Sequence, residues 1–158
     1  GILLSNQHQR LVTQYPDKLV ELAAADFTLK SNEHTLQVGQ STWDQVRQVY
    51  PQGKILGMSS VYRPEGQAFV FTFTKKSNVL TKVDINGSGL ATSRGLAVND
   101  SFAKVVAAYG EDYVKSYLKN DPAIFDAIYG SNQNVVFHIK DGVVQRIVLE
   151  YPLVDKEE

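Results

Sequence analysis

The sequence contains no cysteine, no long apolar run and almost no net charge. Without cysteine the chain has no disulfide, no thiolate metal ligand and no cysteine nucleophile. No stretch approaches the ~20 consecutive apolar residues of a membrane-spanning helix. Its 16 lysines and arginines against 17 aspartates and glutamates give a formal charge of −1, which leaves no basic excess for nucleic acid or for an anionic membrane surface. We therefore expect no nucleic-acid partner, and recognition through a local surface.

What is present is an ordinary globular composition. The chain has 158 residues, of which 43% are hydrophobic, and this is enough for one compact unit with a core. Because the chain begins with Gly1 instead of methionine, we expect that a signal segment or membrane anchor has been removed from it. Any contact with a membrane is then expected through that removed segment.

Two stretches of the chain resemble one another at a constant offset of 60 residues. Residues 36–50 and 96–110 each combine a strand end, a capped turn and one amphipathic helix, and the strands that follow match at a slightly larger offset. We predict two tandem repeats, 35–90 and 91–152, after an N-terminal helix and lead-in strand in 1–34 and before a tail in 153–158. The alternative is two helix-plus-hairpin segments that look alike by convergence.

Each repeat is predicted to start with a short helix. In the first repeat, Ser41 and Asp44 have the spacing of a capping box. In the second repeat, Asp100 or Ser101 caps the first turn, and Gly110 follows the last one. Both helices are too short to be stable alone, so each must bury its apolar stripe against strands.

Alternation of apolar and polar residues predicts the strands. In the N-terminal segment, a helix over 17–25 is followed by a hairpin of 27–30 and 35–38. After the helix of the first repeat, strands are predicted at 55–63, 67–74 and 79–86. After the second helix, a less regular stretch at 111–126 leads to strands at 127–129, 135–140 and 143–151. Asp141 and Gly142 predict a type I′ turn, because both of its central residues need positive φ.

These elements predict an α+β fold of two tandem helix-plus-antiparallel-meander repeats, with the helices on one face of the sheet. The more apolar set in the strands is expected under the helices: Phe69, Phe71, Phe73, Val83, Ile85, Phe137, Ile139, Ile147, Leu149 and Tyr151. The alternate positions are expected on the uncovered face: Val70, Thr72, Thr74, Lys82, Asp84, Val136, His138, Lys140, Arg146, Val148 and Glu150.

Two sets of residues are candidates for binding. The first is on the uncovered face and comprises Thr72, Lys82, His138, Arg146, Val148 and Glu150. The second lies in the irregular segment 111–134 and comprises Tyr113, Tyr117, Phe125 and Tyr129, because aromatic anchors dominate interfaces. Each set has an alternative explanation. The face can be an ordinary solvated surface whose charges pair across strands, and the aromatic residues can hold the segment against the core.

The residues of the second repeat resemble a known fold. Residues 92–101, the helix that ends in Ala108-Tyr109-Gly110 and the meander that closes on residues 137–143 are similar to the beta-lactamase inhibitor protein-like fold of bacterial cell-envelope proteins. That family includes an inhibitor that grips an enzyme with a concave sheet, and small outer-membrane assembly lipoproteins. The resemblance covers about residues 27–151. It implies an extracytoplasmic domain, secreted or membrane-anchored, that is not an enzyme and binds a protein or peptide of the envelope.

No catalytic or cofactor motif is present. His8, His34 and His138 are far apart and lack the spacing of a metal site. Residues 84–89 begin like a calcium loop, but Gly95 stands where a bidentate glutamate is required. No dinucleotide or phosphate loop is found either. We therefore predict no metal and no cofactor.

Two functions remain from the sequence. The first is a non-catalytic cell-envelope or secreted protein-binding module that uses the uncovered face. The alternative is a small hydrolase with a site in the cleft between the repeats, assembled from His138, a serine and an aspartate, since catalytic triads are defined by geometry and not by sequence order. Arg94 is expected either to tie the repeats together through backbone carbonyls or to meet an acidic partner.

Overall fold

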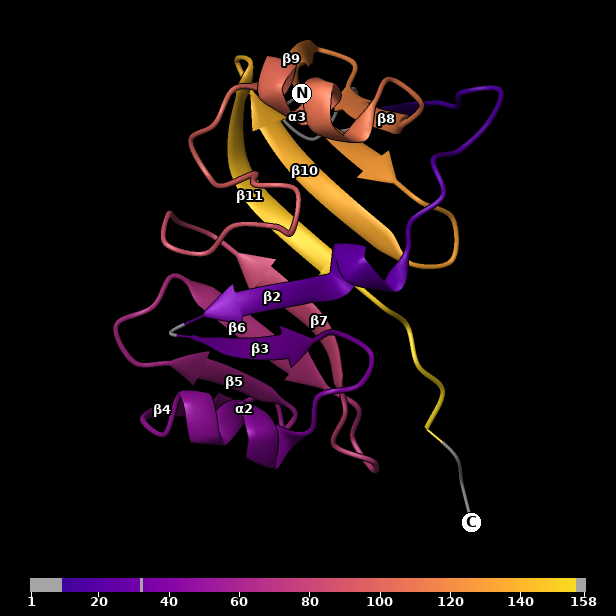
Figure 1. Cartoon of the computed structure of the whole chain (residues 1–158). Coiled ribbons are helices and arrows are strands. Elements are labelled where there is room, and N and C mark those ends of the chain that lie inside the picture. Colours follow the sequence, from indigo (N-terminus) through magenta and orange to yellow (C-terminus); the bar gives the residue numbers. More distant parts are fainter. Residues whose placement is uncertain (1–9, 32, 156–158) are drawn as a thin grey trace, which may run out of the picture.

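A nine-stranded antiparallel sheet dominates the structure, a computed structural model that describes residues 10–31 and 33–155 (Figure 1). Its strand order is β1-β8-β9-β10-β11-β7-β6-β5-β4. The strands are β1 (Leu11–Gln14), β4 (Gly53–Leu56), β5 (Val61–Pro64), β6 (Phe69–Phe73), β7 (Leu80–Ile85), β8 (Val114–Leu118), β9 (Asp121–Tyr129), β10 (Asn134–Lys140) and β11 (Val143–Glu150). The remaining elements are the 3-10 helix η1 (Ala24–Phe27), the hairpin β2 (Thr28–Ser31) and β3 (His34–Gln37), α2 (Trp43–Val49) and α3 (Phe102–Tyr109).

The predicted α+β fold of two tandem helix-plus-meander repeats is wrong. The chain forms one large antiparallel sheet, and its two α-helices have only seven and eight residues. The physical reason is the pairing of β7 with β11, which joins the strands from both halves of the chain into a single hydrogen-bonded ladder. The local similarity at an offset of 60 residues arises because both stretches contain a capped helix followed by strands with alternating residues. Such patterns do not specify which strands pair.

The core lies under the junction of β7 and β11. Val83 pairs with Leu149 and Ile85 with Ile147, and all four side chains are fully buried. The apolar sides of α2, α3 and the β2–β3 hairpin join the same cluster, and Figure 1 shows the hairpin crossing in front of β5, β6 and β7. The predicted core set is confirmed for nine of its ten residues, because only Tyr151 remains partly exposed.

The helix caps are confirmed in one helix and displaced in the other. Ser101 caps α3, where its side chain accepts a hydrogen bond from the backbone N–H of Lys104. The cap of α2 is Thr42, which forms its capping box with Gln45 and not the predicted box of Ser41 and Asp44. The neighbouring Ser41 hydroxyl instead accepts a hydrogen bond from the backbone of Gln37 at 2.8 Å, so it fixes the preceding turn.

The helix predicted over 17–25 is absent from the structure. Residues 17–22 contain no regular element, and only the single turn of η1 follows. Val20 and Leu22, which suggested a helical stripe, instead pack against the core from an irregular segment. An apolar spacing of a few residues is compatible with either arrangement, so tertiary packing decides between them.

Two strand predictions are also wrong. Residues 55–63 form a hairpin and not a single strand, because the chain reverses between β4 and β5 through positive φ values at Gly57, Met58 and Ser59. Met58 gives no turn signal in the sequence. The stretch 111–126, predicted to be irregular, contains β8 and most of β9.

Other predictions are confirmed. Asp141 and Gly142 both have positive φ, 51° and 77°, in the tight turn between β10 and β11. The first predicted hairpin exists as β2 and β3. Among the described residues, no helix has both the length and the apolar character needed to cross a membrane.

Asp100 gives a pH-dependent prediction. Its carboxylate accepts a hydrogen bond from the backbone N–H of Ala97 at 2.8 Å and pairs with Lys104 at 3.0 Å, and both contacts lower the pKa of this carboxyl. Because the pKa of Asp100 is lower in the folded state than in the unfolded state, the carboxylate stabilises the folded state at pH values above its ordinary pKa. This stabilisation is lost as the pH falls through the pKa of the folded state. Asp100→Ala is therefore expected to cost about 1 kcal/mol at pH 7.

Urea unfolding at pH 7 and at pH 3 or below measures this effect, and the difference from the parent protein should shrink at the lower pH. Lys104→Gln is the matched control, because it removes the ion pair and keeps the hydrogen bond from Ala97. A difference between Asp100→Ala and the parent protein that does not change with pH would contradict the prediction.

Candidate functional site

The face of the sheet opposite the helices brings the first predicted set of binding residues together. We call this surface the open face, and it is formed by Val70 and Thr72 of β6, Lys82 and Asp84 of β7, Arg146, Val148 and Glu150 of β11, Val136, His138 and Lys140 of β10, and Asp126 and Ile128 of β9. All of these residues are partly or fully exposed. Thr74, which alternation also placed here, is buried and hydrogen-bonds Ser77 in the turn after β6.

A row of aliphatic side chains crosses the open face. Cross-strand pairing places Val70 opposite Asp84, Asp84 opposite Val148, Val148 opposite Val136 and Val136 opposite Ile128. The four aliphatic residues are partly exposed and do not belong to the hydrophobic cluster under the helices. The row is therefore an apolar strip that lies outside the hydrophobic cluster under the helices.

Ion pairs flank this row. Arg146 donates to Asp84 through Nε at 3.0 Å and through Nη2, and Lys82 Nζ lies 3.8 Å from the second carboxylate oxygen of Asp84. Two cations therefore share one carboxylate whose side chain is 15% exposed. The carboxylate in the middle of the aliphatic row is thus paired with two cations, so an ion-paired site interrupts the aliphatic strip at β7.

His138 and Asp126 form a second polar pair on the open face. His138 Nδ1 lies 2.6 Å from an oxygen of Asp126, and both side chains are about two-fifths exposed. Ser116 of β8 stands opposite Asp126 on the other side. The order across the strands is therefore serine, aspartate, histidine, and two strand spacings of ~4.8 Å separate the serine from the imidazole. A triad needs the histidine between the other two groups, so this row lacks the geometry of the hydrolase alternative.

The four aromatic candidates do not form a loop. Tyr117 lies on β8, Phe125 and Tyr129 on β9, and Tyr113 just before β8. Phe125 and Tyr129 are buried, and the rings of Tyr113 and Phe125 both pack edge-on against Phe102 of α3. Burial raises the pKa of the Tyr113 and Tyr129 phenols. The predicted placement in a loop is therefore wrong, because Tyr113, Phe125 and Tyr129 pack against Phe102 and Tyr109 of α3. A role of the four aromatic residues in binding stays a prediction.

Sequence reasoning missed the contribution of β9 to the open face. The run Ile124, Asp126, Ile128 alternates with Phe125, Ala127 and Tyr129, and the first set is half exposed while the second is buried. This period of two is the signal that identifies a strand with one covered face. The assignment of 111–126 as irregular hid it.

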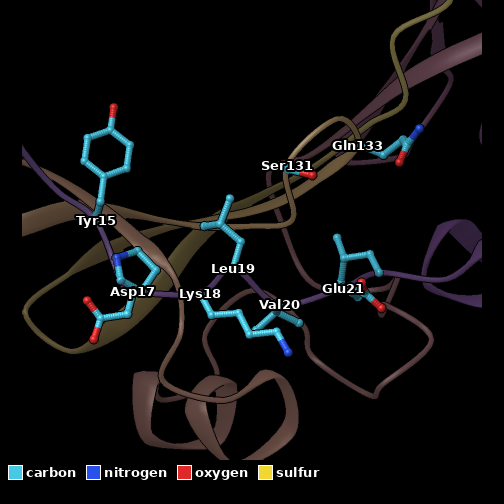
Figure 2. Close-up of a pocket in the computed structure, with 10 residues that line it drawn as sticks. Tyr15, Asp17, Lys18, Leu19, Val20, Glu21, Ser131 and Gln133 are labelled. Atoms are coloured by element: carbon cyan, nitrogen blue, oxygen red, sulfur yellow. The ribbon is translucent and has the colours of Figure 1, made fainter.

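Four cavities of 400–670 Å³ lie elsewhere in the described part of the chain, and none of them borders His138. The largest, about 670 Å³, is lined by residues 15–22 of the N-terminal segment together with Ser131 and Gln133 from the loop after β9 (Figure 2). It carries Asp17, Lys18 and Glu21 without a concentration of one charge. No convergent set of catalytic groups lines it.

Potential metal ligands are dispersed. Within residues 10–31 and 33–155, no three histidine, aspartate or glutamate side chains gather closely enough to hold a metal ion. His34 and His138 are on different sheets, and His8 lies outside the described residues. The expectation that no metal or cofactor is used stays a prediction.

Arg94 has a structural position away from the open face. Its guanidinium bonds Asp26 of η1 and the carbonyl of Ala108 in α3, so it realises both of the contacts expected from the sequence, within one chain. The hydrogen bonds that Arg94 donates to Asp26 raise the pKa of Arg94. Asp155 likewise attaches the start of the tail, because it accepts hydrogen bonds from the Ser77 hydroxyl and from the backbone N–H groups of Lys76 and Ser77. These hydrogen bonds lower its pKa to about 2.

Comparison with known proteins finds a similarity of fold and none of sequence. No family model matches it, and no curated protein is similar in sequence. One solved structure has a similar fold, that of a DUF4309 family protein (YjgB) from Bacillus subtilis, with a TM-score of 0.59 and 13% identity over 82% of this chain and 90% of that chain. At this identity the likeness shows the fold alone. The resemblance to the beta-lactamase inhibitor protein-like fold is not tested by these comparisons and stays a prediction.

Proposed function

We propose that this protein is a non-catalytic binding module that holds a partner protein or peptide against the open face. The observation that carries the proposal is the aliphatic row of Val70, Val148, Val136 and Ile128, which is partly exposed and lies outside the hydrophobic cluster under the helices. Burying such a row contributes roughly 25 cal/mol per Å² of apolar surface. The rigid ladder beneath it holds the side chains in place, so that binding orders few groups.

The charges around the row supply specificity. Lys82, Lys140 and Arg146 are matched by Asp84, Asp126 and Glu150, and contacts with Lys82, Arg146 and His138 already satisfy Asp84 and Asp126. A partner must therefore complement a balanced pattern and not a single sign of charge. We further propose a cell-envelope or secreted location, which is supported only by the resemblance of the sequence.

The test replaces three polar residues of the open face. Thr72, His138 and Arg146 are changed together to alanine, and the variant is used beside the parent protein as bait for capture from an envelope extract of the source cells. A true partner should bind the triple variant about 30-fold more weakly, because truncation of central interface residues costs about 2 kcal/mol. Quantitative mass spectrometry gives the readout, and purified partner then allows titration.

A matched control variant carries alanine at Gln40, Gln48 and Lys119, which are exposed and lie outside the open face. It should retain the captured partner. Val136→Lys adds a charge in the aliphatic row and should also abolish capture, while circular dichroism confirms that the fold persists. Capture that is equal for the parent protein, the open-face triple variant and Val136→Lys would refute the proposed function.

A further inference from the structure

The sheet ends at β4, and no described strand pairs with its outer edge. All four residues of β4 are exposed. Ile55 is 49% exposed, and Met58 at the tip of the hairpin is 93% exposed. Natural proteins protect such an edge with short strands, charged side chains, proline or bulges. The strand β4 has four residues and carries Lys54, but it contains no proline and pairs with β5 without a bulge. An edge of this kind is a template for another extended chain.

The hydrogen-bonding pattern shows which groups the edge offers. Phe73 N–H donates to the carbonyl of Ser60 at 2.7 Å, so Ser60 faces β6, and the next residue, Val61, faces β4 opposite Leu56. Hydrogen-bonded positions alternate along an antiparallel pair. Ile55 therefore directs both its N–H and its C=O away from the sheet, toward solvent.

The edge also has an uncompensated positive charge. Lys54 stands directly opposite Arg63, both are exposed, and neither forms an ion pair or hydrogen bond through its side chain with the rest of residues 10–31 and 33–155. Like charges directly opposite one another on a sheet are destabilising. A cavity of about 430 Å³ adjoins the two side chains, and Glu65 also lines it without forming an ion pair with either of them. A carboxylate placed there relieves the repulsion.

We propose that the free edge of β4 binds an extended acidic segment of a partner protein as an additional strand. Side chains alternate between the two faces of a strand, so an acidic residue of the segment lies against Lys54 and Arg63 while its neighbours lie beside Ile55. The segment therefore alternates acidic and apolar residues. A second copy of this chain fits less well, because antiparallel pairing of two β4 strands brings four basic side chains together. The proposal is independent of binding at the open face.

The probe is an eight-residue peptide of alternating glutamate and valine with blocked ends and a fluorescent label. Fluorescence anisotropy is expected to show saturable binding that weakens with salt, and NMR is expected to show slowed exchange of the Ile55 amide. The corresponding lysine–valine peptide should bind at least about tenfold more weakly, and a glutamate–valine peptide with N-methylated backbone amides should not bind. Equal binding of all three peptides would overturn the proposal.

Two variants locate the site on the protein. Ile55→Pro removes the outward N–H without breaking a bond to β5, a change that edge strands tolerate, and it should weaken binding at least about tenfold, whereas Ile55→Val should not. Lys54→Glu with Arg63→Glu should reverse the preference between the two charged peptides, and this variant keeps the test valid if the proline variant does not fold. The proposal is overturned if binding survives in Ile55→Pro but is lost in the open-face triple variant. It is also overturned if the free protein sediments as a dimer that Ile55→Pro dissociates, since a second copy then occupies the edge.

Discussion

Arg94→Ala is expected to lower the free energy of unfolding by about 2–4 kcal/mol. Arg94 Nε donates to one oxygen of Asp26 at 2.7 Å, Nη2 donates to the other at 3.2 Å, and Nη1 donates to the carbonyl of Ala108 at 2.9 Å. The guanidinium also lies over the ring of Tyr109, 4.6 Å from its centroid. One side chain therefore connects η1, the segment before α3 and the last turn of α3.

The size of this effect follows from burial. The Asp26 side chain is 6% exposed, so removal of Arg94 leaves a carboxylate in the interior whose one remaining donor among the described residues is the backbone N–H of Ala23. Loss of one partner from a buried pair costs about 3–5 kcal/mol. We expect a smaller loss for Arg94→Ala, because the Arg94 side chain is 33% exposed and water can reach the Asp26 carboxylate once the guanidinium is removed.

Urea unfolding of a small variant set tests this prediction. Arg94→Lys keeps the charge and loses the planar fork, so it should give an intermediate loss. Adding Asp26→Asn to Arg94→Ala should restore part of the stability, because the uncompensated charge is removed. If the two substitutions are not coupled, the double variant will be less stable than Arg94→Ala by the full cost of Asp26→Asn alone. That result would contradict the role of Arg94 as the partner of the buried Asp26 carboxylate.

Gly130→Ala is expected to cost about 2–5 kcal/mol. Gly130 has φ of +88° in the turn between β9 and β10, where a side chain strains the backbone by about 1–3 kcal/mol. A Cβ added there would overlap the carbonyl oxygen of Gln133 and come within 2.7 Å of a methyl group of Leu22. Such overpacking adds about 1–3 kcal/mol. The N-terminal segment packs against this turn, so both should loosen together.

Gly142→Ala is the matched control for Gly130→Ala. Gly142 also has positive φ, but no atom lies within 4 Å of an added Cβ, so only the backbone strain remains. Urea unfolding should therefore rank Gly130→Ala as clearly less stable than Gly142→Ala. Hydrogen exchange should show faster opening of β9 and β10 in Gly130→Ala. If the two variants lose the same free energy of unfolding, then steric overlap around position 130 contributes nothing to the cost of Gly130→Ala.

Most of the candidate site could be predicted from the sequence. Alternation in β6, β7, β10 and β11 placed Thr72, Lys82, His138, Arg146 and Val148 on one face, and the structure brings them together. The contribution of β9 was missed, because the stretch 111–126 was predicted to be irregular. The placement of the aromatic set was wrong for the same reason, since rings that seemed to belong to a loop belong to covered strands.

The sequence by itself determined the local features of this protein. Ser101 caps α3 and Asp141-Gly142 forms the tight turn, because each depends only on backbone geometry within a few residues. The buried face of most strands followed from a period of two. Each of these signals is complete within a short window of sequence.

Only the tertiary structure decided how these parts assemble. The pairing of β7 with β11 and the contact of Arg94 with Asp26, 68 residues away, have no local signature. Backbone hydrogen bonds are alike along every strand, so they do not specify a partner, and strand order is set by the arrangement that buries the most apolar surface in one core. The aliphatic row on the open face and the free edge of β4 exist only because that arrangement was selected.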